Sequence, residues 1–266
     1  KEAGHTVRLL VRSEKKAASI FESLGVEIDE IILGNITDRK AVEAAVRGCD
    51  AVIHSAAMVA TAEKYANEVY ETNVGGTKLV IGSSLAAGVD KIIYISIVSA
   101  LFNVGDTVMN EKSSVSSGNN PYGRTKITCE NYVRELQSQG ASIIITYPTG
   151  VVGAFDPGLS DPHFGIKLFV SVFTFTSSTG MQFVNACDVA KAHVAILERV
   201  EGSDRFILGG HYYSWFDLLE IIKRLTGRQL FSVHIPGRIL RFLGKCADVV
   251  IKLTGKEFPF TEEGMT

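Results

Sequence analysis

The alternation of short apolar runs with amphipathic segments in the first 150 residues constrains the fold more than any other feature of this sequence. Runs rich in Val, Ile and Leu predict five strands, at Thr6–Val11, Glu27–Leu33, Ala51–His54, Lys91–Ser96 and Ser142–Tyr147. Helical patterns fall between them, at about 14–24, 38–47, 64–88 and 121–139. Strands that alternate with helices in this way predict an α/β fold, a doubly wound parallel sheet of the Rossmann type.

The ends of these segments carry the expected boundary residues. Asp38 is placed to cap the second helix, and Gly25, Gly88 and Gly140 each stand where a helix should stop before a strand. Ligands of such sheets bind at the carboxyl ends of the strands. A site is therefore expected near the strand ends that follow the third, fourth and fifth runs.

A glycine-rich turn normally opens a nucleotide-binding sheet, and this sequence has none. Neither G-x-G-x-x-G nor G-x-x-G-x-x-G occurs in it, and Lys1 to His5 has the pattern of a helix end that leads directly into a strand. We therefore expect that a first βα unit of roughly 20 residues is missing from the chain.

Composition excludes several classes of partner. The chain of 266 residues carries 27 basic and 29 acidic side chains, a net charge of −2, so no nucleic acid is expected to bind. Its four cysteines are far apart and form no Cys-x-x-Cys pair, which favours reduced thiols, no metal site and a cytoplasmic location. The most apolar stretch, Leu168 to Phe175, is too short for membrane insertion.

Tyr122 and Lys126 form the pattern that best indicates chemistry. On the helix expected at 121–139 they are i and i+4, so their side chains share one face. A free tyrosine has a pKa near 10, and lowering it to about 7 requires roughly 4 kcal/mol. An ammonium about 4 Å away supplies up to about 4 kcal/mol at an effective dielectric constant near 20. The pair could equally be an ordinary surface contact, so its context decides.

Seven stretches provide that context, and they occur in the order and spacing of one family: GHTVRLLVRS, GNITD, AVIHSAA, NVGGT, PYGRTK, YPTGVVG and ACDVAKAH. With these stretches the chain resembles the extended short-chain dehydrogenase/reductases, the NAD-dependent epimerase/dehydratase superfamily. The resemblance is closest to the branch of dihydroflavonol reductases, cinnamoyl-CoA reductases and 3β-hydroxysteroid dehydrogenases. It extends over essentially the whole chain.

The resemblance implies a role for individual residues. Tyr122 would be the catalytic acid–base, and Lys126 would assist it and hold the nicotinamide ribose. Asn73 would be structural, and Asp188 would brace its helix. The remaining cofactor-binding positions that the resemblance implies are Arg12, Asn35, Ile36, His54, Ser55, Ala56, Pro148, Thr149, Gly150 and Val151. For His54, a strand-end histidine without a ligand is the alternative.

The choice of cofactor is indicated at the end of the second family strand. Enzymes that use NAD usually place Asp or Glu there, whereas an arginine accommodates a 2′-phosphate. This chain has Arg12, so we expect NADP(H) to be preferred, with NAD(H) possible; a solvated basic turn is the alternative. Asn35 stands where the family usually has Asp, and weaker contact with adenine is expected.

One position departs from the family pattern. The family commonly has a Ser-Ser pair at the end of the fourth run, and here the second position is Ile97, which cannot donate a hydrogen bond to a substrate oxygen. Ser99 is the first candidate for the missing hydroxyl and Ser96 the reserve. In an extended strand Ser96 would face away from the side of Ile97. Loss of one such donor costs about 10²–10³-fold in rate.

The second half of the chain resembles the family's smaller α/β substrate-binding region. We expect a dinucleotide-binding domain at 1–150, to which 181–200 return, and a substrate-binding region at 151–180 and 201–266. That region is rich in aromatic residues, and Arg199 is the sole arginine between Gly153 and Ser203. This favours a small apolar substrate over a nucleotide-sugar. The basic amphipathic stretch at 235–254 is expected to pack as a helix, with membrane contact as the alternative.

These features predict an NAD(P)-dependent oxidoreductase that interconverts a ketone and a secondary alcohol on an apolar, ring-bearing substrate. Two alternatives remain open. Ile97 favours a catalytically impaired relative that binds dinucleotide, and the family also contains nucleotide-sugar epimerases and dehydratases. The resemblance further favours a homodimer.

Overall fold

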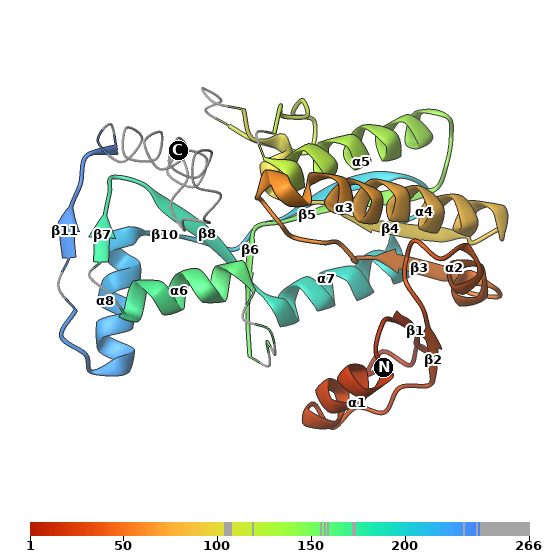
Figure 1. The fold of residues 1–266 in the computed structure, drawn as a ribbon, viewed down its shortest axis with the longest axis horizontal. Helices are drawn as coiled ribbons and strands as arrows, with labels where there is room; N and C mark the ends of the chain where they lie inside the picture. Colours follow the sequence, from red (N-terminus) through yellow and green to blue (C-terminus); the bar gives the residue numbers. More distant parts are fainter. Residues whose placement is uncertain are drawn as a thin grey trace. The chain divides into compact units, whose positions relative to one another are not determined.

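The computed structural model describes residues 1–239 except 104–107, 119, 155, 157, 159, 172–173, 231 and 238. The chain divides into two compact units, and each is described by itself (Figure 1). The first unit consists of Lys1–Thr149, Gly153–Pro157 and Ala186–Gly209, and the second of Gly150–Val152, Gly158–Asn185 and Gly210–Thr266.

A four-stranded parallel sheet forms the centre of the first unit. Its strands lie in the order β3-β4-β5-β9, with bounds Ala51–His54, Lys91–Ile95, Ile143–Pro148 and Asp204–Leu208. β5 is buried along its whole length, as its unbroken apolar sequence predicts for a strand covered on both faces.

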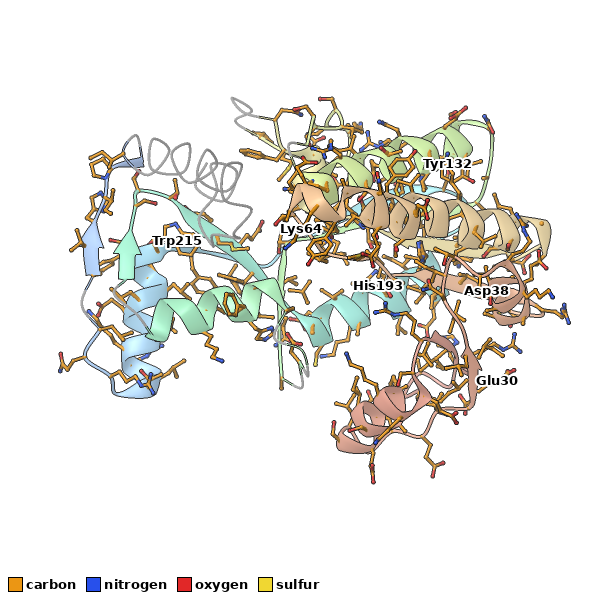
Figure 2. All side chains as sticks on the ribbon, viewed as in Figure 1. Glu30, Asp38, Lys64, Tyr132, His193 and Trp215 are labelled. Carbon is orange, nitrogen blue, oxygen red and sulfur yellow. The ribbon has the colours of Figure 1, made fainter. Side chains whose placement is uncertain are left out.

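Helices cover both faces of this sheet. On one face Ile92, Tyr94 and Tyr147 pack against α4 (Gly76–Ala86) and α5 (Pro121–Ser138). On the other face Ile93 and Ile144 pack against Ile196 of α7 (Ala186–Arg199). His193 of α7 (Figure 2) also lies within 3.0 Å of the Thr146 hydroxyl. The strand residues thus alternate between the two layers, as the period of two requires.

A second parallel pair, β1 (Arg8–Val11) and β2 (Glu30–Leu33), lies in the same unit with α1 (Glu14–Ser23) and α2 (Arg39–Val46). Asp38 (Figure 2) caps α2 by accepting hydrogen bonds from the amides of Lys40 and Ala41, which confirms its expected role. In the described part of the chain, β1 pairs only with β2, and β3 pairs only with β4.

The helix expected at 64–88 is a continuous helical run with an irregular middle. It comprises η1 (Glu63–Tyr65), α3 (Ala66–Tyr70), the π-helical η2 (Glu71–Gly75) and α4. A π turn inserts one residue per turn and is frequent at functional sites. Here it contains Asn73, whose contacts are described below.

The second unit contains two small sheets. β6 (Gly150–Val152), β8 (Gly180–Asn185) and β10 (His211–Ser214) lie in the order β10-β8-β6, and β7 (Thr174–Thr176) pairs with β11 (Ser232–His234). α6 (Asp161–Ser171) and α8 (Trp215–Thr226) complete the unit. Ser214 and Asp217 form a reciprocal capping box at the start of α8.

The α/β fold class and the five expected strands are confirmed, and Gly25, Gly88 and Gly140 do follow their helices with positive φ. The return of the chain to the first unit runs from Ala186 to Gly209. It therefore includes β9, a strand within the stretch expected to bind substrate. Most of the basic amphipathic stretch at 235–254 lies outside the described residues.

Candidate active site

The carboxyl ends of β3, β4 and β5 lie side by side, because these parallel strands are neighbours in one sheet. The strands end at His54, Ile95 and Pro148, and Ser96 follows directly on β4. The amide of Ser96 still donates to the carbonyl of Thr146 at 2.8 Å, so the sheet pairing extends to this residue. The expected edge for ligands is thus formed by residues from three strands.

Tyr122 and Lys126 lie at the start of α5, in the first unit. Asn120 caps the helix by accepting a hydrogen bond from the amide of Gly123 at 2.8 Å, and Pro121 occupies the first helical position. Tyr122 is half-buried, whereas Lys126 is 5% exposed. Both residues lie in the first two turns of α5, one helical turn apart, as the spacing predicts.

The ammonium of Lys126 is held from β4. Its Nζ donates to the carbonyl of Ile95 at 2.8 Å and lies 5.1 Å from the centre of the Tyr94 ring. Burial lowers the pKa of Lys126 to about 8. The side chain is therefore mostly charged at pH 7 and loses its charge as the pH rises above about 8.

The two candidate hydroxyls occupy very different positions. Ser96 is 1% exposed and its Oγ has no hydrogen-bond partner among the described residues. By the alternation of β4 it lies on the same face of the sheet as Tyr94, the face that α5 covers. Ser99 is exposed on the short helix η3 (Val98–Leu101), and half-buried Ile97 precedes that helix in an extended conformation.

Asn73 connects three segments around the site. Its Oδ1 accepts from the amide of Met58 at 2.7 Å, and its Nδ2 donates to the carbonyl of Met58 and to the Thr125 hydroxyl, both at 3.0 Å. Asn73 thereby ties the loop after β3 to α5, one residue before Lys126. The predicted structural role of Asn73 is confirmed.

The side chain of His54 points into the protein interior. It is 4% exposed, and its Nε2 lies 3.0 Å from the hydroxyl of Thr77 on α4. Burial, followed by the charge of Lys126, lowers the pKa of His54 to about 4, so the ring is neutral near pH 7. The imidazole is thus hydrogen-bonded to Thr77 inside the protein. Ser55 and Ala56, which follow at the strand end, are exposed.

The other cofactor candidates of the first unit follow β1, β2 and β5. Arg12 is exposed, and Asn35 uses its Oδ1 to accept from the amide of Thr37 at 3.2 Å. Ile36 packs against the apolar cluster of α2 and α4. Pro148 and Thr149 are buried at the end of β5. Gly150 and Val151 belong to the second unit, where they pair in β6 with β8.

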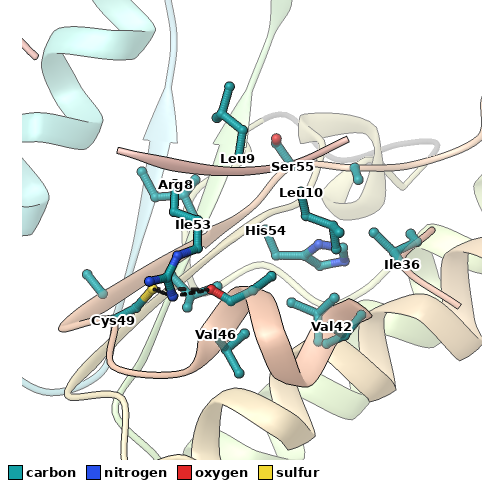
Figure 3. Close-up of a pocket in the computed structure, with 15 residues that line it drawn as sticks. Arg8, Leu9, Leu10, Ile36, Val42, Val46, Cys49, Ile53, His54 and Ser55 are labelled. Carbon is teal, nitrogen blue, oxygen red and sulfur yellow. Dashed lines mark hydrogen bonds between the residues drawn. The ribbon is translucent and has the colours of Figure 1, made fainter. Parts of the chain in front are cut away.

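A pocket of about 220 Å³ lies between β1 and β3 (Figure 3). Leu10 and His54 line it from the two strands, and Val42 and Val46 line it from α2. Arg8 crosses one end, where its Nη1 donates to the carbonyl of Ala45 at 3.1 Å. In the described part of the chain, the edges of β1 and β3 that have no partner strand therefore border one space.

A buried carboxylate that the sequence analysis did not single out lies on the same helix as Lys126. Glu130 of α5 is 0% exposed, and its Oε1 accepts from the Tyr147 hydroxyl at 2.5 Å and from Arg134 Nε at 2.7 Å. The available signal was its position four residues after Lys126, on the same face of the helix.

Comparison with known proteins assigns the chain to a family. The model of the NAD dependent epimerase/dehydratase family matches residues 1–209. The chain belongs to this family. Family members and relatives are NAD-dependent dehydrogenases, reductases and epimerases of the extended short-chain type, and the chain is an enzyme of that type.

Individual relatives of this epimerase/dehydratase chain are distant but cover most of it. "Sterol demethylase protein B" of Methylococcus capsulatus is 24% identical over 92% of the chain and 74% of its own length. A "putative dihydroflavonol 4-reductase" of Synechocystis is 26% identical over 85% of the chain and 67% of its own length. UDP-glucose 4-epimerases also match.

Among solved structures, the crystal structure of gox2253 has a TM-score of 0.80 at 28% identity, with 99% of this chain and 80% of that one covered. This similarity confirms the Rossmann-type fold expected for the chain. In the described part of the chain, no helix is long and apolar enough to cross a membrane.

Proposed function

We propose that this chain is an NAD(P)-dependent oxidoreductase that interconverts a ketone and a secondary alcohol on a small apolar, ring-bearing substrate. One observation carries the proposal: Tyr122 is half-buried one helical turn from the buried, charged Lys126, in a unit whose sheet edge suits dinucleotides. A phenol near an ammonium is an acid–base pair that works near neutral pH.

The residues of the first unit fit a nicotinamide cofactor. When bound, the nicotinamide supplies the hydride chemistry. Tyr122 moves the proton to or from the substrate oxygen at its Oη, and the charge of Lys126 stabilises the phenolate form. The Lys126 ammonium has one hydrogen bond among those described, to Ile95, and can still donate to ribose hydroxyls. The buried hydroxyl of Ser96, which has no hydrogen-bond partner among the described residues, is a further hydrogen-bonding group at the same strand end.

Support for an apolar substrate comes from the second unit and from the relatives. Phe164, Tyr212 and Phe216 of that unit expose about half or more of their surface, and its stretch Gly158–Asn185 contains no arginine. Two of the relatives carry names that refer to sterol and flavonol compounds. A nucleotide-sugar epimerase is the second candidate, because UDP-glucose 4-epimerases are also relatives.

A second alternative, a catalytically impaired relative, rests on Ile97. Ser99 is exposed on η3 and Ser96 is buried, so neither hydroxyl stands at the position of Ile97. A single absent donor lowers the rate by about 10²–10³-fold, so a slow enzyme is the expectation, and an inactive one is the alternative.

A substrate panel tests the reaction class. Purified protein is incubated with NADPH or NADH and with steroid ketones, dihydroflavonols, aromatic aldehydes and UDP-sugars, while absorbance at 340 nm and sugar products are followed. Turnover with a cyclic ketone is expected. Sugar epimerisation without net cofactor oxidation would instead favour a nucleotide-sugar epimerase. No turnover by the wild type, together with turnover by the Ile97→Ser variant, would favour a catalytically impaired relative.

The cofactor preference is part of the same proposal, and it rests on Arg12. Arg12 is exposed directly after β1, and a guanidinium pairs well with phosphate oxygens. Replacement by Asp is therefore expected to raise KM for NADPH about tenfold and to lower KM for NADH. Arg39→Asp, at an exposed arginine at the start of α2, is the control. Equal KM values for both cofactors in the wild type would contradict the preference.

A homodimer in the cytoplasm completes the proposal, and light scattering of the purified protein tests the dimer.

A further inference from the structure

Lys126 poses an electrostatic problem that its hydrogen bond alone does not solve. A buried ammonium is costly unless an anion compensates it. Its closest described contacts, the carbonyl of Ile95 and the ring of Tyr94, are both uncharged. The titratable and charged groups on β3, β4, β5 and α5 that interact with Lys126 or with its neighbours are His54, Tyr94, Tyr147, Tyr122, Cys129, Glu130 and Arg134.

Glu130 is the one carboxylate of that set, and it is paired with Arg134. His54 is neutral because burial lowers its pKa to about 4, and burial raises the pKa of Tyr94 and of the Cys129 thiol. Glu130 accepts a charge-assisted hydrogen bond from Arg134 Nε at 2.7 Å, the geometry of a carboxylate.

Glu130 lies one helical turn from Lys126. The two residues are i and i+4 on α5, which places their Cβ atoms about 5–6 Å apart. Only Oε1 is engaged by Arg134 and Tyr147; Oε2 is buried without a hydrogen-bond partner among the described residues. The Arg134 side chain is 18% exposed and that of Glu130 is 0%, so water screens the arginine charge more than the carboxylate.

We propose that Glu130 is a positioning residue whose buried carboxylate keeps the Lys126 ammonium charged, and so sets the upper pH limit of the proton transfer by Tyr122. This inference rests on the proposed function for its catalytic consequence. Its electrostatic part concerns the folded chain alone. Burial lowers the pKa of Lys126 to about 8, and Cys129 and the charge of Glu130 both oppose this by raising it.

The test measures Lys126 directly, without cofactor or substrate. Protein labelled with ¹³C at the lysine ε-carbon is titrated by NMR between pH 6 and pH 11, and the Lys126 signal is assigned by its absence in Lys126→Arg. In Glu130→Gln the titration midpoint is expected to fall by about one pH unit, since the anion is lost in a low-dielectric interior. Glu135→Gln, the same change at an exposed position of α5, is expected to leave the midpoint unchanged.

A second variant has the opposite sign and keeps the test decisive if Glu130→Gln folds poorly. Arg134→Gln removes the cation that partly neutralises Glu130, so the Lys126 midpoint is expected to rise. Equal midpoints in wild type and either variant would overturn the proposal.

Activity separates this inference from the proposed function. If both hold, the alkaline fall of kcat in Glu130→Gln moves down in pH with the NMR midpoint, while kcat at pH 6.5 changes less than about threefold. A shifted NMR midpoint with an unmoved activity profile would retain Glu130 as the electrostatic partner of Lys126 and refute the acid–base role of the pair. A uniform loss of kcat at all pH values with an unmoved midpoint would indicate a structural role only, and would overturn the proposal.

Discussion

Replacement of Tyr122 by phenylalanine is expected to lower kcat by about 10³-fold, because positioned acid–base groups contribute about 10²–10⁴-fold to rate. The ring that packs at the start of α5 is kept, and only the phenolic oxygen is removed. The loss should therefore appear in kcat, with cofactor affinity and the free energy of unfolding nearly unchanged. Stopped-flow or steady-state oxidation of NADPH with the substrate found in the panel measures it.

Tyr132→Phe is the matched control for this experiment. Tyr132 lies ten residues later on α5 (Figure 2), is half-buried against the core, and has Lys78 Nζ 5.6 Å from its ring centre. It thus also combines a phenol with a nearby lysine, outside the site. Wild-type kcat in Tyr132→Phe with a large loss in Tyr122→Phe is the expected pair of results. Unchanged turnover in Tyr122→Phe would refute the assigned mechanism.

Replacement of Asn73 by alanine is expected to lower the free energy of unfolding by about 3 kcal/mol, since buried groups that lose their partners cost about 1–3 kcal/mol each. The variant removes three hydrogen bonds and leaves the amide and carbonyl of Met58 without their partner. Asn73 itself is 2% exposed, so water cannot readily replace the amide. Urea denaturation followed by circular dichroism measures the loss.

The same variant should also weaken the site, because Asn73 connects the loop after β3 to Thr125, the neighbour of Lys126. We expect a higher KM for the cofactor as well as lower stability. Asn67→Ala, at an exposed position of the same helical run, is the control and is expected to change stability by less than about 0.5 kcal/mol. Equal stability of the two variants would contradict the structural role of Asn73.

Local sequence signals were sufficient for much of the architecture. The apolar runs at β3, β4 and β5 are short and bounded by glycine or polar residues, so their period and their ends are readable without any tertiary contact. The same holds for the start of α5, where Asn120 and Pro121 mark a cap and a first turn. The spacing of Tyr122 and Lys126 then places both on one face of this helix.

The partners of the buried polar groups could not be read in this way. The sequence left open whether His54 contacts a cofactor or belongs to the core. Its hydrogen bond to Thr77 depends on how α4 packs against β3. For Glu130 the local signal was its position four residues after Lys126, and that spacing alone does not separate a solvated helix face from a buried one. Its burial follows from the contact with Tyr147, which is 17 residues away in sequence and on another element.

The sequence by itself determined the alternation of strands and helices, the family resemblance and the Tyr122–Lys126 pair, because periodicity, capping and i,i+4 spacing are properties of neighbouring residues. Only the tertiary structure decided the environment of that pair: the Ile95 carbonyl and Tyr94 ring around Lys126, the carboxylate of Glu130 behind it, and the buried hydroxyl of Ser96. These features depend on which strand a helix covers and how deeply, and burial of charge depends on the whole packed core rather than on any local segment.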